Sequence, residues 1–462
     1  DLIGIIDMKS IRTADERKTV DNFEKTIRYE NNRYVVKLPF KENAPVLENN
    51  MNIAMNRLFS MENKLEKDPD LRDRYREAMN NYAKHGFARE ATVNEIAKFD
   101  KNPQYFIPHR PVIREDKVTT KMRPVFNASS KDKNGNSLNS CLYNGPSLQP
   151  ELVQVLLRFR MNNIAIMADI EKMFCQTKID EADYPFQQYL WRDFDKSIEP
   201  IRYIMTSVMF GVGPSPFLAI GSTKYHANRP DMNEKYPLAC QTAKENTYVD
   251  DVCDGKDSVE ETSRLAAELK QFFAEGGWNL TKFVSNSQEV LESIPEEDRL
   301  IQDVIELVEK DDEGNLKALG IGWNVPSDKF RFQPTERMET PVTKFTKRNM
   351  LSKVAQIFDV FGFYSSFTIR GKIIVQQFWN LHKKWDEPLE GDIVDEFKSW
   401  EKEIPELKEI EIPRRLKLFN GSYSKVEAHG FGDASQIAYG RIIFFRFTLP
   451  DGSVHVEFVM GK

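Results

Sequence analysis

The chain has 462 residues, enough for roughly two to four compact units with hydrophobic cores of their own. Its composition is 40% hydrophobic and 29% charged, and the lack of a long apolar run excludes a membrane-spanning protein. The formal net charge of −6 is unfavourable for binding phosphates, but the charge is segregated. Acidic residues gather between Glu289 and Glu313, and basic residues gather in His109–Arg123 and Lys344–Lys353. An acidic total is therefore compatible with a basic cleft.

The chain begins at Asp1 without a signal-like leader, and we expect a processed fragment of a longer protein. Its four cysteines lie far apart, and none has a histidine or a second cysteine at zinc-site spacing. They are Cys141, Cys175, Cys240 and Cys253. This pattern predicts free thiols in a reducing compartment.

The first part of the chain predicts a short strand at Tyr34–Pro39 and then two helices. Ala54, Leu58, Met61 and Leu65 recur at helical spacing. A second helix is expected to begin at Asp68-Pro69, where an N-cap residue precedes a proline, and to end at Gly86. Residues 105–127 then predict short β segments broken by Pro108, Pro111 and Pro124.

The later elements are predicted from apolar runs and turn residues. Residues 151–230 favour a helix, a buried strand at Ile164–Ala168, a loop and a further helix. A hairpin at Asn246–Val252 precedes a helix over about 258–276. Residues 341–385 are expected to be helical with an interruption at Gly362. Residues 426–460 alternate as three strands, with a turn at Pro450–Gly452.

Three carboxylates lie where neighbouring strands could bring them together. Asp169 follows the buried strand, and Asp250 and Asp251 lie in the expected hairpin. Oxygen ligands of this kind suit Mg²⁺ shared with a phosphate-bearing substrate. Joining nucleotides requires two such ions, one to activate the attacking hydroxyl and one to neutralise the leaving pyrophosphate. An Asp-Asp pair alone is more often a solvated turn, so the hypothesis depends on the surrounding motifs.

Five segments in chain order resemble the catalytic motifs of reverse transcriptases. They are Ala168–Phe174 (ADIEKMF), Phe210-Gly211-x-x-x-Ser215-Pro216, Tyr248–Asp251 (YVDD), Asn279–Phe283 and Leu319–Trp323. More narrowly, three stretches resemble the BEL/Pao group of LTR retrotransposons: Val112–Asp116, Ala168–Phe174 and Ala355–Asp359. The resemblance covers nearly the whole chain. Two positions depart from it, since Asn127 stands where many relatives have Asp and Phe210 replaces a glutamine of retroviral enzymes.

The resemblance implies roles for individual residues. Asp169, Asp250 and Asp251 would be catalytic metal ligands for two Mg²⁺ ions, with Mn²⁺ as a substitute, and Lys282 would be the general acid for pyrophosphate departure. Phe174, five positions after Asp169, would be a steric gate against the ribose 2′-hydroxyl. The remaining predicted contacts to the incoming dNTP are Arg114, Arg123, Gly211 and Tyr248.

Two further sites follow from the resemblance. The segment formed by Gly320, Ile321, Gly322 and Trp323 would be the primer grip. Asp433, in Gly430–Ser435, resembles the first metal ligand of an RNase H domain. Because that chemistry needs carboxylates from later elements, we do not expect this chain to hydrolyse RNA in a hybrid.

The implied fold is α+β, a right-hand polymerase with fingers, palm and thumb, followed by a partial RNase H-like β unit. The expected divisions are 1–100 (an N-terminal extension and the start of the fingers), 101–335 (fingers and palm), 336–425 (thumb and connection) and 426–462 (a truncated RNase H-like unit). The implied partners are an RNA template, a DNA primer-template, an RNA/DNA hybrid, dNTPs and other units of a retroelement polyprotein, without a membrane. The implied place is the cytoplasm, within retroelement particles.

The leading hypothesis is therefore an RNA- and DNA-templated DNA polymerase of an LTR retroelement. A viral RNA-dependent RNA polymerase ranks below it, because those enzymes commonly carry a second Asp where this chain has Phe174. The non-enzymatic alternative is a retroelement-derived nucleic-acid-binding or scaffold subunit without polymerase turnover. The three carboxylates argue against that alternative and the acidic net charge argues for it.

Overall fold

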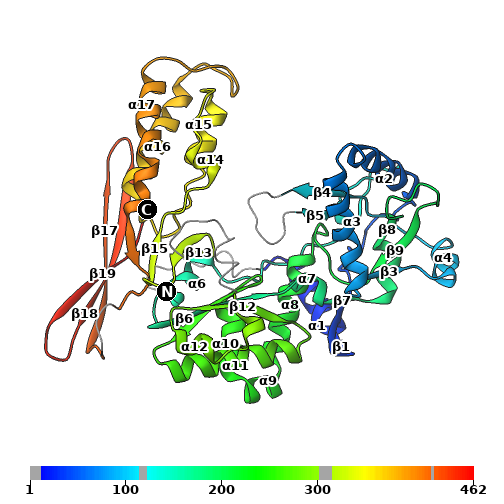
Figure 1. Cartoon of the computed structure of the whole chain (residues 1–462), viewed down its shortest axis with the longest axis horizontal. Coiled ribbons are helices and arrows are strands. Elements are labelled where there is room, and N and C mark those ends of the chain that lie inside the picture. Colours follow the sequence, from blue (N-terminus) through cyan, green and yellow to red (C-terminus); the bar gives the residue numbers. More distant parts are fainter. Residues whose placement is uncertain (1–11, 114–121, 301–314, 418–420) are drawn as a thin grey trace. The chain divides into compact units, whose positions relative to one another are not determined.

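The computed structural model describes residues 12–113, 122–300, 315–417 and 421–462. The chain, drawn as a ribbon in Figure 1, divides into two compact units, each assembled from separate segments. The first unit comprises residues 1–149, 168–252 and 265–281, and the second comprises residues 150–167, 253–264 and 282–462. Strands β6 (Ile164–Ile170), β11 (Asp251–Lys256) and β12 (Leu280–Ser285) each pass from one unit into the other.

The N-terminal part of the first unit consists of helices and short strands with clear start signals. Thr13 caps α1 by accepting a hydrogen bond from the Glu16 N–H, and the Glu16 carboxylate accepts one from the Thr13 N–H, which completes a capping box. Asp68 caps α3 by accepting from the Leu71 N–H at 3.1 Å. The helices are α1 (Ala14–Thr26), α2 (Met51–Leu65), α3 (Pro69–Lys84), α4 (Val93–Phe99) and α5 (Leu138–Cys141). The strands are β1 (Arg28–Glu30), β2 (Arg33–Val36) and β3 (Ala88–Glu90).

Strands β4 (His109–Ile113) and β5 (Met122–Phe126) form a two-stranded antiparallel ribbon. The predicted interruption by prolines is wrong here, because Pro111 and Pro124 lie inside the strands and face each other in register. Each strand of a two-stranded ribbon has a free edge, where a residue without an N–H is tolerated. A three-stranded sheet with the order β3-β9-β8 completes this region, formed by β8 (Gln188–Trp191) and β9 (Ile201–Met205) with β3.

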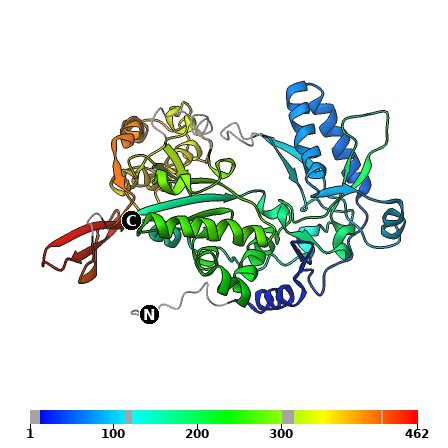
Figure 2. The same ribbon diagram turned by 60° about the horizontal axis from the view of Figure 1, so that its bottom comes forward.

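A four-stranded sheet with the order β10-β11-β6-β12 carries three of the five segments that resemble reverse transcriptase motifs. β10 (Thr247–Tyr248) and β11 form an antiparallel hairpin, and helices α10 and α11 lie against one face of the sheet (Figure 2). The other elements of this part are α7 (Met173–Gln176), β7 (Lys178–Ile179), η2 (Glu181–Phe186), α8 (Ser215–Asn228), α9 (Pro230–Lys235), α10 (Pro237–Glu245) and α11 (Val259–Glu275). The predicted helix, strand, loop and helix over 151–230 are confirmed, with additional short elements in the loop.

The second unit combines a helical cluster with two antiparallel sheets. One sheet has the order β13-β14-β15-β16 and the other β17-β18-β19, which appears as a long separate ribbon in Figure 1. The strands are β13 (Asn315–Ala318), β14 (Ile321–Asn324), β15 (Lys329–Arg331), β16 (Glu411–Pro413), β17 (Lys425–Ala434), β18 (Tyr439–Thr448) and β19 (Val454–Gly461). The three strands and turn predicted for 426–460 are confirmed.

Two hydrophobic clusters hold the second unit together. The first surrounds Trp400 and Phe397 between the helices, and the second surrounds Trp323 and Phe159 beside the sheet of β13–β16. The helices and 3₁₀ turns are α6 (Leu152–Phe159), α12 (Gln288–Glu292), η3 (Glu296–Asp298), α14 (Glu336–Glu339), α15 (Lys347–Val354), α16 (Ser365–Gln377), η4 (Phe378–Asn380), α17 (Asp392–Lys402) and η5 (Ile404–Glu409). The helical segment predicted for 341–385 is confirmed in part. Gly362, at φ 75°, lies in the non-helical stretch 355–364 between α15 and α16, and residues 341–346 and 381–385 are also not helical.

Candidate active site

Asp169 lies at the end of β6, one residue before the strand stops. In the alternating pattern of the strand, Ala168 and Ile170 are buried while Asp169 is half-buried. The backbone around it is held from two sides. The Ile170 N–H donates to the Asp250 carbonyl oxygen at 2.8 Å, and the Glu171 N–H donates to the Asn279 carbonyl oxygen at 2.9 Å. Asp169 therefore has a fixed place beside the β10–β11 hairpin.

The predicted tight hairpin around Asp250 and Asp251 is confirmed. Tyr248 and Asp251 face each other across the hairpin, so that Val249 and Asp250 form a two-residue turn. Val249 has φ 58°, and a positive φ at the first turn position is the feature of a type II′ hairpin turn, where glycine is usual. For a β-branched residue this backbone is strained. The surrounding contacts therefore hold a strained turn that presents two half-buried carboxylates.

The donor set of this hairpin and β6 fits a hard cation. It consists of carboxylate oxygens from adjacent strands, which Mg²⁺ prefers over nitrogen or sulfur ligands. Within the ranges that the structure describes, no three His, Cys, Asp or Glu side chains form a group that could hold a metal ion by itself. Mg²⁺ is commonly bound through one or two carboxylates together with water and substrate phosphates rather than in an all-protein cage. The residues present therefore fit a site that a phosphate-bearing substrate completes.

Phe174 is placed by the short helix α7, which follows directly after β6. The chain enters α7 through Lys172, which has φ 48°. Gln176 donates from its side chain to the Glu171 carbonyl oxygen at 3.1 Å and accepts from the Arg33 guanidinium at 2.5 Å. Phe174, the predicted gate residue, follows Asp169 by five positions. Its side chain is only 6% exposed, so neighbouring residues cover most of the ring.

Phe210 provides that cover. Its ring meets the Phe174 ring edge to face, with centroids 4.4 Å apart and an interplanar angle of 87°. Phe210 itself is 49% exposed. An exposed aromatic ring on a buried one forms an apolar wall that a flat or sugar-like group can contact. From the sequence, Phe210 was noted only as a difference from the glutamine of retroviral enzymes, and no role was predicted for it.

The loop after Phe210 is held by one asparagine that sequence reasoning missed. The Asn139 side chain donates to the Gly211 carbonyl oxygen at 3.0 Å and accepts from the Gly213 N–H at 2.8 Å. Gly211 has φ 102°, and a Cβ atom there would lie well inside contact distance of the Phe126 carbonyl oxygen. Ser215 then begins α8 with a proline in its first turn, as predicted. The capping pattern Ser137–Ser140 was the only sequence signal near Asn139.

Of the two arginines predicted to contact the incoming dNTP, the structure describes only Arg123. Arg123 lies on β5 opposite Val112 and is exposed, because Met122, Pro124 and Phe126 take the buried positions of the strand. Its guanidinium is thus available to a ligand. Arg114 lies outside the described residues.

The predicted primer-grip residues and Lys282 belong to the second unit. Lys282 is exposed on β12 and has φ 58°. Leu319 and Gly320 form the two-residue turn between β13 and β14, and both have positive φ, as in a type I′ turn. Ile321 and Gly322 are buried on β14. Trp323 is fully buried, which leaves the turn itself as the part of the segment that a ligand can reach.

Trp323 is part of a polar network inside the second unit. Its indole N–H donates to Asp328 Oδ1 at 3.0 Å, and the fully buried Arg414 pairs with the same carboxylate at 2.6 Å. Arg414 also donates to the Phe159 carbonyl oxygen at 2.5 Å. This network fixes the hairpin of β13 and β14 against α6. Asp359 of the Ala355–Asp359 motif has a comparable structural role, because its carboxylate accepts two N–H groups at the start of α16.

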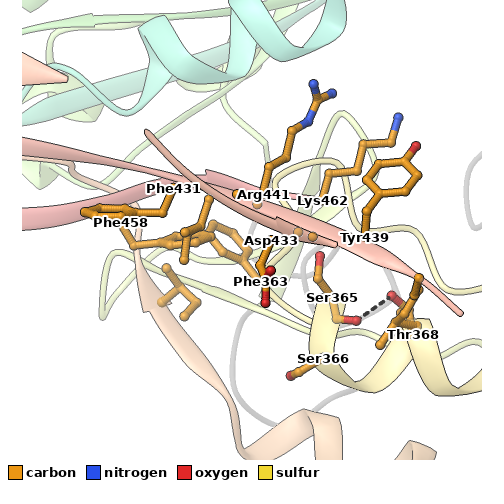
Figure 3. Close-up of a pocket in the computed structure, with 18 of the residues that line it drawn as sticks. Phe363, Ser365, Ser366, Thr368, Phe431, Asp433, Tyr439, Arg441, Phe458 and Lys462 are labelled. Carbon is orange, nitrogen blue, oxygen red and sulfur yellow. Dashed lines mark hydrogen bonds between the residues drawn. The ribbon is translucent and has the colours of Figure 1, made fainter. Parts of the chain in front are cut away.

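A cavity of about 950 Å³ lies in the second unit between α16 and the sheet of β17–β19. Figure 3 shows Asp433 pointing from β17 toward Ser365 and Thr368, while Arg441 and Tyr439 extend from the other side of the strands. Because side chains alternate along a strand, this arrangement follows from the register, in which Asp433 faces Gly440. Of the described residues that line the cavity, Glu457 is the one other acidic residue, and partial burial raises the pKa of its carboxyl group.

The remaining sequence expectations concern cysteines and membranes. The four cysteines, all within the described residues, form no disulfide, as predicted, and all four are buried. Burial raises the pKa of the Cys175 thiol to about 12, which makes it unreactive. Among the described residues, no helix has both the length and the apolar character needed to span a membrane.

Comparison with known proteins identifies similar chains. Residues 346–462 match the family model described as the Pao retrotransposon-like RNaseH-like domain. Two structures of the foamy viral protease-reverse transcriptase in complex with double-stranded DNA match at 12% identity, with TM-scores of 0.54 and 0.52. They cover 98% and 82% of this chain and 77% and 53% of their own chains. A third, in complex with an RNA/DNA hybrid, matches at 11% identity and a TM-score of 0.50, covering 97% of this chain and 50% of that chain.

These matches confirm the resemblance to a reverse transcriptase of a BEL/Pao-type retroelement. The mixed α/β fold resembles that of the foamy viral protease-reverse transcriptase structures, and the RNase H-like family model covers residues 346–462. The chain spans about half the length of two of the foamy viral chains. The comparison with curated proteins found no match.

Proposed function

We propose that this chain is an RNA- and DNA-templated DNA polymerase, the reverse transcriptase of an LTR retroelement. One observation carries the proposal: Asp169 and the Asp250-Asp251 pair lie at the ends of adjacent strands, joined by the hydrogen bond from the Ile170 N–H to the Asp250 carbonyl oxygen. Adjacent strand ends are where a nucleotidyl-transfer enzyme needs its carboxylates. The likeness of the fold to foamy viral reverse transcriptases supports the same function.

In this proposal Asp169, Asp250 and Asp251 would hold two Mg²⁺ ions, for which Mn²⁺ is a substitute. Bound there, the ions supply charge neutralisation at the attacking hydroxyl and at the leaving pyrophosphate. The strained turn at Val249 serves to orient both carboxylates before substrate arrives. Lys282 would deliver a proton to the leaving pyrophosphate.

The exposed Arg123 would contact the triphosphate of the incoming dNTP, with Arg114 as a second contact, because a guanidinium pairs with phosphate oxygens in a fork. Gly211 would allow the backbone to approach the nucleotide, and Tyr248 would line the same pocket. Phe174 would exclude a ribose 2′-hydroxyl by steric contact. Its edge-to-face contact with Phe210 keeps the ring from rotating out of the way.

The proposed right-hand arrangement assigns the sheet β10-β11-β6-β12 to the palm, the β4–β5 ribbon to the fingers and helices α15–α17 to the thumb. The turn Leu319–Gly320 and the following strand would be the primer grip. RNA templates, DNA primer-templates and RNA/DNA hybrids are then the expected partners, and foamy viral relatives of similar fold were solved in complex with double-stranded DNA and a hybrid. Asp433 would contribute a single carboxylate of an RNase H-like site.

Primer extension on a defined RNA template with Mg²⁺ tests the proposal. Asp250→Asn keeps the size of the side chain but removes a charge, so dNTP incorporation should fall by on the order of 10³-fold or more. Asp433→Asn is the matched control and should leave incorporation unchanged. Circular dichroism should show that both variants are folded.

Full incorporation by the Asp250→Asn variant would refute the metal assignment. A folded wild-type chain that binds template-primer but incorporates nothing with Mg²⁺ or Mn²⁺ would favour the alternative, a retroelement-derived nucleic-acid-binding or scaffold subunit. Incorporation of ribonucleotides in preference to deoxynucleotides would favour an RNA polymerase.

A further inference from the structure

The Trp379–Leu389 loop, whose first two residues are the end of η4, exposes two tryptophans on the surface of the second unit. Trp379 is 65% exposed and Trp385 is 40% exposed, and their ring centroids lie 5.7 Å apart. The other four tryptophans of the chain, Trp191, Trp278, Trp323 and Trp400, are each at most 3% exposed. Large aromatic rings are normally buried for their apolar area, so two neighbouring exposed ones indicate a contact surface.

This loop is fixed to the start of α15 rather than free to fold its rings inward. The Lys347 ammonium donates to the Leu381 carbonyl oxygen at 2.9 Å, and the Arg348 N–H donates to the Trp385 carbonyl oxygen at 3.2 Å. The Leu389 N–H donates to the Phe345 carbonyl oxygen at 2.9 Å. Phe378 before the loop and Leu389 at its end are buried in the helical core. The backbone is therefore anchored at both ends and in the middle while the two rings stay in solvent.

Basic side chains lie between the two rings in the chain. His382, Lys383 and Lys384 separate the two tryptophans, and all three are exposed. The charge of Asp386 is paired with Arg348 at 2.8 Å. Glu387 accepts the Lys384 backbone N–H at 3.2 Å and keeps its negative charge beside the two lysines. Arg348 also lies over the Trp385 ring, 6.0 Å from its centroid.

Exposed aromatic rings interleaved with lysines match the chemistry of unpaired nucleotides. Every base has a flat face that stacks on an indole, and the lysines complement the phosphates between bases. A protein partner would meet the rings equally well but has no general need of the lysines. A double helix offers its phosphates but hides its base faces.

We propose that the loop Trp379–Leu389 binds unpaired nucleotides of RNA or DNA, with bases stacked on Trp379 and Trp385 and phosphates on Lys383 and Lys384. This contact is separate from the proposed nucleotidyl-transfer site and needs none of its carboxylates. Through this loop the chain would bind a single-stranded segment of nucleic acid.

The test uses the full chain and a short fluorescein-labelled oligo(U) or oligo(dT), with binding measured by fluorescence anisotropy at low salt. Trp379→Ala combined with Trp385→Ala should weaken binding by on the order of tenfold for each base whose stacking is lost. Lys383→Ala combined with Lys384→Ala should weaken binding and flatten its dependence on salt. Tyr423→Ala, which removes an exposed aromatic ring elsewhere in the same unit, is the matched control and should leave binding unchanged.

Intrinsic fluorescence provides a direct readout of stacking. Because the other four tryptophans are buried, quenching of wild-type fluorescence by the unlabelled oligonucleotide should come from Trp379 and Trp385 and should be absent in the double variant. Unchanged affinity and unchanged quenching in that variant, with an unchanged melting temperature, would overturn the proposal. Binding of the wild type to anionic phospholipid vesicles but not to the oligonucleotide would reassign the loop to a membrane surface. None of these measurements requires nucleotide incorporation, so their outcome is independent of the primer-extension test.

Discussion

Asp250 and Asp433 both lie in segments that resemble catalytic motifs, but their surroundings differ. Asp250 lies in a strained turn, and its carbonyl oxygen accepts a hydrogen bond from the Ile170 N–H of β6. Asp433 lies on β17, where nearly every residue is exposed and Gly430 has open space around it. A motif aspartate therefore has a defined geometry only where several separate segments hold its backbone. Matched substitutions in the two regions can show whether that contrast in rigidity is real.

The largest difference in stability is expected between two glycine-to-alanine variants, one at Gly211 near the candidate active site and one at Gly430 on β17. In Gly211→Ala, the new Cβ would clash with the Phe126 carbonyl oxygen, and alanine is strained at φ 102°. The cost should be about 3 kcal/mol or more in the free energy of unfolding, with a large loss of dNTP incorporation.

Gly430→Ala on β17 is the matched control, because a Cβ atom there meets no other atom. Its effect on the thermal unfolding midpoint should be small, within about 0.5 kcal/mol. Equal midpoints for the two variants would remove the distinction between a rigid site and an open strand.

The second effect concerns pH and the buried His109 of the first unit. Tyr75 Oη donates to His109 Nδ1 at 2.7 Å, and Nε2–H donates to the Leu190 carbonyl oxygen at 2.9 Å. Burial lowers the pKa of His109 to about 4, from an ordinary value of 6.5. Between pH 6.5 and pH 4 the unfolded chain therefore binds a proton that the folded chain does not, so stability falls as the pH falls.

Through His109 alone, the free energy of unfolding should be about 2 kcal/mol lower at pH 5 than at pH 7. His109→Gln should be less stable at pH 7 but should lose less on acidification, which thermal unfolding at the two pH values measures. His429→Gln on the exposed strand β17 is the control, and it should show the same pH dependence as the wild type. A wild-type slope in the His109→Gln variant would contradict the assignment.

Local sequence patterns predicted those parts of the site that depend on interactions between residues close together in the sequence. The strand that ends near Asp169, the hairpin at Asp250 and the proline at the start of α8 follow from apolar runs, turn residues and caps. The pairing of β6 between β11 and β12 depends on segments far apart in the chain, and no local pattern encodes it. The positive φ of Val249 was equally hidden, because a β-branched residue gives no signal for that backbone. Asn139 and Phe210 escaped because their roles exist only through contacts with distant residues.

The smallest effect, and the most specific, is expected from Asn139. Asn139→Ala removes the bonds to the Gly211 carbonyl oxygen and the Gly213 N–H, so the loop that presents Phe210 loses its fixed position over Phe174. Each neutral hydrogen bond is worth about 1 kcal/mol, so kcat/KM for dNTP incorporation should fall about tenfold, mainly through a higher nucleotide KM.

Asn80→Ala is the matched control, because it also removes hydrogen bonds of one asparagine, to Trp191 and Asp193. It should lower stability by a similar amount and leave the nucleotide KM unchanged. Phe174→Val should differ from both by raising ribonucleotide incorporation, since it removes the ring rather than its support. If Asn139→Ala and Asn80→Ala changed the nucleotide KM equally, the effect would be general loosening of the first unit. A KM effect confined to Asn139→Ala would show that the hydrogen bonds around Gly211 hold the proposed nucleotide pocket in shape. The exposed strand β17 around Asp433 has no comparable support.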